Sequence, residues 1–146
     1  MNFLKAGMHK LPEYMQLRQA VESNALPAVA TGLSGIHKAT IINALVQDTN
    51  KTALLLAADE AEAQRICQDL TSMGLRSFIY PTRDFTFRNV ESASREYEHQ
   101  RIQVLSRILK HDCDVVVACM DAALQYTIPP NELEGRMIEL KKGQTV

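Results

Sequence analysis

The sequence predicts an α/β fold, a three-layer sandwich with a mostly parallel sheet. Short apolar segments alternate along the chain with segments whose apolar residues recur at helical spacing. The apolar segments lack the alternation of a half-exposed strand, which is typical of strands covered on both faces. Strands joined through helices form right-handed crossovers and therefore parallel sheets. A length of 146 residues suits one domain.

The first third of the chain predicts a helix, a strand and a second helix. Apolar residues at helical spacing indicate a helix that ends before Pro27. Residues 26–31, LPAVAT, are apolar and are followed by a glycine, so we expect a strand that runs into a turn. A second helix is expected over residues 37–48. The apolar positions of the two helices are Leu11, Tyr14, Leu17 and Val21, then Ala39, Ile42, Leu45 and Val46.

The middle of the chain continues this alternation. A strand that starts at Thr52, TALLLAA, is expected to be covered on both faces. Asp59 is placed to cap the next helix, with Glu62 three residues later as in a capping box, and Gly74 ends that helix. Residues 76–81 are predicted to form a third short strand. The buried stripe of the capped helix is expected to be Ala63, Ile66, Cys67 and Leu70.

Residues 82–94 show no clean period, which predicts a long loop. Phe85 and Phe87 are expected to anchor this loop to the body of the protein. Ser94 is placed to cap a charged helix that continues to about Lys110. The inward positions of this helix are expected to be Ile102, Leu105, Ile108 and Leu109.

The last part of the chain predicts a strand, a short helix and a boundary. Residues 113–120, CDVVVACM, are the most strand-like segment of the sequence. A short helical turn is expected over residues 121–125, with Asp121 as its N-cap. The double proline in IPPNELEG marks a subdomain boundary. We therefore expect one α/β domain over residues 1–128, and a linker with the truncated start of a following subdomain over residues 129–146.

The overall composition excludes several classes of function. A formal net charge of -1 leaves no global positive field for nucleic acid or an anionic membrane. No apolar run approaches the roughly 20 residues that span a bilayer, and no signal-peptide core is present, so a cytoplasmic protein is expected. The cysteines and histidines lack ligand spacing, which indicates buried or half-buried thiols rather than disulfides or a metal site. These residues are Cys67, Cys113, Cys119, His9, His37, His99 and His111.

The segment TGLSGIHKA resembles a phosphate-binding loop that lacks two functional positions. A working loop reads GxxxxGK[ST] between a strand and a helix. Its backbone amides hold the phosphate, its lysine neutralises charge, and its hydroxyl binds magnesium. Gly32 and Lys38 are present, but His37 replaces the second glycine and Ala39 replaces the magnesium ligand. Thr40 comes one residue late and would point in another direction around the helix.

Three interpretations of this loop are open. It is either a plain strand–turn–helix junction, or a weak anion site at the helix N-terminus, or the loop of an active P-loop ATPase with an unorthodox sequence. We favour the junction, because incomplete motifs give many false positives. No cofactor, metal or catalytic residue is then expected in this chain. The vestigial loop consists of Gly32, Gly35, His37, Lys38 and Ala39.

One further group of residues and one single residue could have a function. Basic and aromatic residues between positions 83 and 101 could bind nucleic acid, but interleaved acids are more typical of a solvated helix face or a protein-binding surface. Asp121 follows an apolar strand like the acid of a Walker B segment, yet no second acid stands beside it, which favours a helix cap. The first group comprises Arg83, Arg88, Arg95, Arg101, Phe85, Phe87 and Tyr97, with Asp84, Glu91, Glu96 and Glu98 among them.

Several strings together resemble the N-terminal region of the bacterial transcription-repair coupling factor (Mfd) family. The most specific are TGLSGIHKA, ADEAEA after the second expected strand, and YPTRD after the third. The likeness extends over nearly the whole chain from about residue 11. In that family this region is similar to domain 1a of the repair helicase UvrB, but without its helicase motifs and without ATP hydrolysis. His37 and Ala39 stand where UvrB-like proteins carry glycine and threonine.

The resemblance implies a non-catalytic scaffold and interaction module in transcription-coupled nucleotide excision repair. The parent protein would recognise RNA polymerase stalled at a lesion and remove it with a DNA translocase motor that uses ATP and magnesium outside this chain. It would also recruit UvrA, chiefly through the following subdomain, so no residue here is assigned to UvrA. The other domains of the parent are further expected partners, whereas a membrane is not. A stand-alone binding protein is a third alternative.

Overall fold

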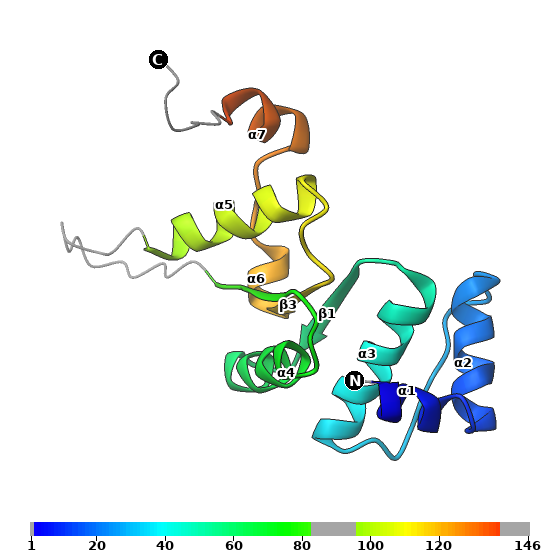
Figure 1. Ribbon diagram of the computed structural model, residues 1–146. Helices are drawn as coiled ribbons and strands as arrows, with labels where there is room; N and C mark the ends of the chain where they lie inside the picture. Colours follow the sequence, from blue (N-terminus) through cyan, green and yellow to red (C-terminus); the bar gives the residue numbers. More distant parts are fainter. Residues whose placement is uncertain (1, 83–95, 138–146) are drawn as a thin grey trace.

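The computed structural model describes residues 2–82 and 96–137 and has an α/β architecture (Figure 1). Within these residues one parallel sheet has the strand order β1-β3-β2. The strands are β1 (Ala53–Ala57), β2 (Ser77–Tyr80) and β3 (Val115–Cys119). The helices are α1 (Asn2–Met8), α2 (Pro12–Glu22), α3 (Gly35–Thr49), α4 (Glu60–Ser72), α5 (Glu96–Leu109), α6 (Met120–Leu124) and α7 (Pro130–Arg136).

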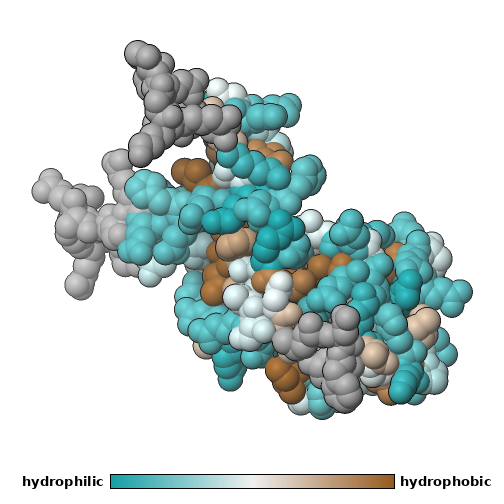
Figure 2. Space-filling model, viewed as in Figure 1, coloured by the Kyte–Doolittle hydropathy of each residue, from teal (hydrophilic) through white to brown (hydrophobic). Residues whose placement is uncertain are grey.

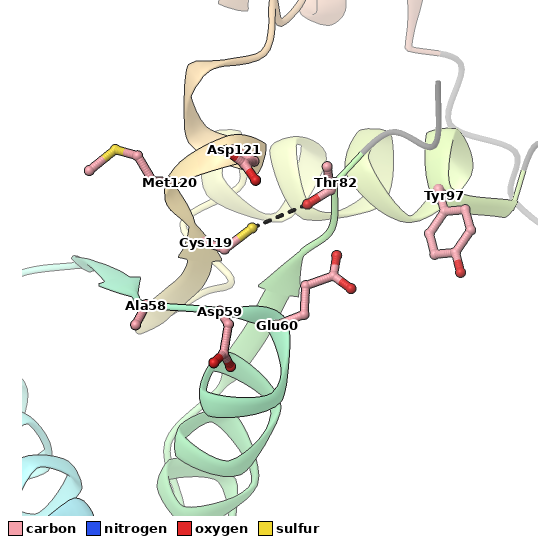
Figure 3. Close-up of a pocket in the computed structure, with 8 residues that line it drawn as sticks. All are labelled: Ala58, Asp59, Glu60, Thr82, Tyr97, Cys119, Met120 and Asp121. Carbon is pink, nitrogen blue, oxygen red and sulfur yellow. Dashed lines mark hydrogen bonds between the residues drawn. The ribbon is translucent and has the colours of Figure 1, made fainter. Parts of the chain in front are cut away.

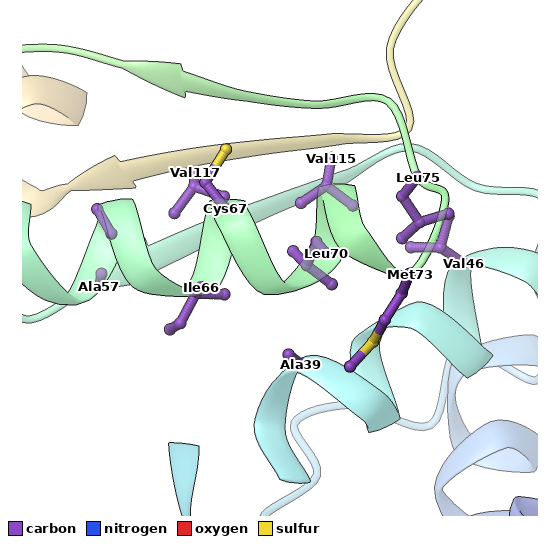
Figure 4. Close-up of a cluster of buried hydrophobic side chains, with 11 residues drawn as sticks. Ala39, Val46, Ala57, Ile66, Cys67, Leu70, Met73, Leu75, Val115 and Val117 are labelled. Atoms are coloured by element: carbon purple, nitrogen blue, oxygen red, sulfur yellow. The ribbon is translucent and has the colours of Figure 1, made fainter. Parts of the chain in front are cut away.

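Strand β3 is the centre of the fold because all five of its residues are apolar and buried. Val115 and Val117 pack on one face against α3 and α4 (Figure 4). Val116 and Ala118 pack on the other face against α5 and α6. Helices thus lie on both faces of the sheet, which confirms the predicted α/β class and is compatible with a three-layer sandwich.

The start of α4 follows the predicted capping pattern. The Asp59 side chain accepts a hydrogen bond from the Glu62 amide at 2.7 Å. The Glu62 carboxylate bonds back to the Ala58 amide at 2.9 Å, one residue earlier than in an ordinary capping box. Gly74 follows the helix with a φ of +93°, which an L side chain rarely adopts. The expected buried stripe is confirmed at Ala63, Ile66, Cys67 and Leu70.

The predicted strand over residues 26–31 is wrong. These residues form neither helix nor strand, and they pair with no strand in the described part of the chain. Their second half lies in a groove with Leu17 of α2 and Ile41 of α3. All six residues are exposed, so the apolar character of this segment did not lead to a buried strand.

Two expectations about buried faces are also wrong. The strand β1 is covered on one face only, since Leu54 and Leu56 are 64% and 47% exposed. In α5 the expectation is confirmed for Leu105, which packs against the core, but it is wrong for Ile102, which is 49% exposed. The buried residues of this helix are Arg101 and Val104. The helix is rotated relative to the apolar pattern because Arg101 hydrogen-bonds to carbonyl groups inside the fold.

Helices α1 and α7 lie outside the predicted elements. Leu133 of α7 is buried, and Ser106 of α5 donates a hydrogen bond to the Met137 sulfur at 3.4 Å. The boundary between residues 128 and 129 stays a prediction. Phe85, Phe87 and Ser94 lie outside the described residues, as do residues 138–146. None of the described helices is long and apolar enough to cross a membrane.

Candidate functional site

The vestigial loop forms the turn that begins α3. Gly32 has a φ of +75°, a conformation that favours glycine, so its role in the turn is confirmed. Ser34 is the N-cap residue of α3, and Gly35 is its first residue. The Ser34 hydroxyl lies 3.0 Å from Nδ1 of His37. His37 thus contacts the cap residue of its own helix.

The ammonium group of Lys38 is held by a carboxylate of the next helix. Its Nζ lies 3.0 Å from Oε1 of Glu62. The hydrogen bond from the Ala58 amide, followed by the contact with Lys38, holds the pKa of Glu62 below its usual range. Glu62 is therefore ionised at neutral pH and competes with any phosphate for this lysine. The pair is solvent-exposed, so it contributes little to stability.

Ala39 points into the core instead of towards the loop. It is fully buried in the cluster between α3, α4 and the sheet, where Figure 4 shows it near Met73. The neighbouring Thr40 hydroxyl donates to the Ile36 carbonyl at 2.8 Å. Neither side chain is placed as the hydroxyl ligand of a magnesium ion in a phosphate-binding loop would be.

A cavity of 440 Å³ lies at the carboxyl ends of the strands (Figure 3). Open α/β sheets bind their ligands at this edge. Three carboxylates line the cavity, however, and they disfavour an anionic ligand. No group of three or more metal-ligating side chains occurs in the described ranges. The lining residues are Ala58, Asp59, Glu60, Thr82, Tyr97, Cys119, Met120 and Asp121.

Asp121 lines this cavity, and its predicted role as an N-cap is wrong. The helix α6 begins one residue earlier, at Met120, so Cys119 occupies the N-cap position without a side-chain cap bond. The apolar strand continues straight into the helix, which shifts the cap by two residues. Asp121 lies in the first turn, where its negative charge interacts favourably with the helix dipole.

Arg101 has a structural environment that the sequence did not reveal. It is 2% exposed, and its Nη1 donates to the Pro81 carbonyl at 2.7 Å and to the Gln125 side chain at 3.1 Å. Its guanidinium lies 4.0 Å from the centre of the Tyr80 ring. Arg101 is therefore not available to a nucleic acid. Its position three residues before Val104, on the buried stripe, is the one local signal of this burial.

The other basic and aromatic candidates are only partly described. Arg83, Arg88 and Arg95 lie outside the described residues. Tyr97 is 47% exposed and lies at the cavity described above. The structure thus brings Tyr97 to the acidic edge of the sheet, whereas Arg101, one turn later on α5, is buried.

The three cysteines are free and buried, as predicted. Burial raises the pKa of the thiols of Cys67 and Cys113, so both stay protonated at neutral pH. Cys119 lies 3.1 Å from the Thr82 hydroxyl at the rim of the cavity. These environments are typical of structural rather than reactive cysteines.

Comparison with known proteins gives one informative similarity. Over 104 residues, or 70% of this chain, the sequence is 32% identical to the transcription-repair-coupling factor of Bacillus subtilis (strain 168). The chain is similar to a transcription-repair-coupling factor. This similarity supports the family resemblance of the sequence motifs. The matched stretch makes up 9% of the length of that curated relative. No family model matches the chain. No solved structure matches it either.

Proposed function

We propose that this chain is a non-catalytic, UvrB-like interaction module of a protein that couples transcription to DNA repair. The observation that carries the proposal is the state of the vestigial loop. Its lysine is paired with Glu62, and the position of its magnesium ligand is a buried methyl group at Ala39. Both features disfavour the binding of a nucleotide with its magnesium ion. The similarity to a transcription-repair-coupling factor supports the role in repair.

The alternative function is that of an active P-loop ATPase with an unorthodox loop. Phosphoryl transfer depends on a metal ion and on positive charge around the transferred group. The acidic lining of the nearby cavity and the Lys38–Glu62 pair oppose that requirement. The proposed module therefore acts through its surface, and the fold is retained for binding.

An ATPase assay distinguishes the two functions. The chain and its Lys38→Ala variant should both show only the background rate of ATP hydrolysis in the presence of magnesium. The Thr40→Ala variant serves as a matched control for a change in the same helical turn. ATP hydrolysis that is lost in Lys38→Ala and kept in Thr40→Ala would establish an ATPase and would contradict the proposal of a non-catalytic module.

The proposed partner of the repair protein is UvrA. We expect the following subdomain to carry most of the contact, so this chain alone should capture little UvrA. A pull-down should compare this chain with one extended through the next subdomain of its parent. Strong capture by the extended chain supports the proposal, whereas no capture by either chain would remove UvrA as the partner.

A further inference from the structure

The face of the sheet that carries α5 and α6 is only partly covered. Leu54 lies opposite Val116 in the strand register, so the side chains of Leu54 and Leu56 are on this face. Helix α5 packs against β2, and α6 has only five residues. Leu54 and Leu56 are therefore 64% and 47% exposed. Parallel sheets are almost always covered on both faces, so this exposure is unusual.

An apolar groove of 290 Å³ lies on the uncovered part of the sheet. Its walls come from β1, α5 and α6, with Leu54, Ile108 and Ala123 among the residues that line it. In Figure 2, hydrophobic atoms lie below α5, at the level of the sheet. None of the described residues that line the groove carries a charged side chain. The groove therefore suits an apolar side chain and not an ion.

Two large side chains project into water beside this groove. Leu124 and Tyr126 are each 77% exposed. Their neighbours in the chain, Ala123 and Thr127, both line the groove. Leu124 and Tyr126 thus form a knob next to the groove, on the same side of the molecule.

The groove and the knob together form an apolar patch that consists of Leu54, Leu56, Ile108, Leu124 and Tyr126. These side chains are between 37% and 77% exposed. A large side chain has roughly 200 Å² of surface, so the five expose on the order of 600 Å². Apolar patches of this size mark interaction sites, and a standard interface buries about 800 Å² on each partner. The apolar patch therefore supplies most of the area that an interface needs.

A knob beside a groove is complementary to a second copy of the same surface. In a twofold interface one patch meets itself, so the knob of each copy can enter the groove of the other. The five side chains of the apolar patch are neutral, so the two copies do not repel each other there. Because one pairing occupies both knobs and both grooves, association stops at two copies.

We propose that the apolar patch is the interface of a homodimer, in which Leu124 and Tyr126 of each copy lie in the groove of the other. Pairing removes Leu54 and Leu56 from water, and the burial of apolar surface drives it. The vestigial loop begins α3, which packs on the other face of the sheet. The dimer therefore leaves the loop accessible and does not depend on the proposed function.

Analytical ultracentrifugation of the chain tests this proposal. Between roughly 1 μM and 1 mM, the mass should rise to that of two chains and no further. Leu124→Lys places a charge inside the interface and should raise the dissociation constant at least tenfold. The control is Val29→Thr, at an 86% exposed position in a different groove, beside α2 and α3, and it should leave the dissociation constant unchanged.

A mixture of two variants tests the insertion of the knob into the groove. Leu54→Glu should weaken the dimer as Leu124→Lys does, and circular dichroism should show that both variants are folded. In a mixed dimer the new ammonium group of one copy meets the new carboxylate of the other. The mixture should therefore dimerise at least tenfold more tightly than either variant alone.

Three results would overturn the proposal. The first is the mass of a single chain at every concentration. The second is association that grows beyond two copies, or that Val29→Thr weakens as much as Leu124→Lys. The third is a single-chain mass at every concentration for the chain extended through the next subdomain of its parent, which would assign the apolar patch to that subdomain.

Discussion

Position 39 carries an alanine, where a working phosphate-binding loop has a Ser or Thr whose hydroxyl binds magnesium. Ala39 has no exposed surface, and it packs among the side chains of α4 and the sheet. A larger or polar side chain at this site would need space and a hydrogen-bond partner inside a closely packed cluster. The side chain of Ala39 therefore lies in the core and not at the loop.

The Ala39→Thr variant is expected to lose stability and to gain no nucleotide binding. The hydroxyl and the extra methyl group should cost about 1–3 kcal/mol in the free energy of unfolding. Urea unfolding and a titration with Mg-ATP measure the two effects. The same change at the exposed Ala61 of α4 is the control and should cost less than about 1 kcal/mol. Nucleotide binding restored by Ala39→Thr would contradict this account.

Arg101 joins three separate parts of the chain. Its guanidinium bonds to the carbonyls of Pro81 and Ala122 and to the side chain of Gln125. It also stacks on the ring of Tyr80. A planar guanidinium can serve several acceptors and an aromatic face at once, which an ammonium group cannot do.

The Arg101→Lys variant should therefore be destabilised although the charge is preserved. We expect a loss of about 2–3 kcal/mol in the free energy of unfolding, because carbonyl acceptors and a buried charge lose partners. Arg65→Lys on the exposed face of α4 is the matched control and should change stability by less than about 0.5 kcal/mol. Equal stability of the two variants in urea would show that Arg101 is not a structural residue.

Among the helices, Asp48 of α3 links α1 and α2 to α3 through ion pairs and a hydrogen bond. Its carboxylate lies 2.7 Å from Lys5 Nζ and from His9 Nε2, and it accepts a hydrogen bond from the Tyr14 hydroxyl at 2.6 Å. Burial opposes its ionisation, but the hydrogen bonds from Lys5, Tyr14 and His9 outweigh burial and hold the pKa of Asp48 well below its usual range. Burial and Asp48 raise the pKa of Tyr14, which stays protonated as the donor.

The Asp48→Asn variant should be less stable by about 2 kcal/mol at pH 7. A lowered pKa in the folded state gives stability that is present above the unfolded pKa of about 3.9 and is lost as the pH falls below it. The difference between the variant and the wild type should therefore narrow between pH 5 and pH 3. Urea unfolding across this range, with the exposed Glu134→Gln as the control, measures it. A constant difference would disprove the role of ionised Asp48.

Local patterns predicted the elements that depend on local physics. The cap formed by Asp59 and Glu62 lies within four residues, so the sequence shows it directly. Residues 26–31 are apolar, but they are exposed and pair with no described strand, which their local pattern does not show. The burial of Arg101 depends on partners 20 to 24 residues away in the chain. The loop was predicted correctly as a turn, but the Lys38–Glu62 contact required the structure.

At the scale of the whole molecule, helices cover both faces of a short parallel sheet, and the vestigial loop lies at its carboxyl edge. In an active P-loop protein this edge would hold phosphates and magnesium. Here it presents carboxylates, a paired lysine and a buried alanine. The fold class followed from the alternation of segments, because parallel sheets require crossover helices. The chemistry of the edge depended on which side chains meet there.

Calorimetric titration of the chain with Mg-ATP, together with its melting temperature, tests whether the chain folds without a productive nucleotide site. A ligand at about 100 times its Kd would stabilise the folded chain by about 2.7 kcal/mol. We expect no heat of binding and no rise in melting temperature, for the wild type and for Lys38→Ala alike. A micromolar affinity in the wild type that Lys38→Ala removes would contradict the account.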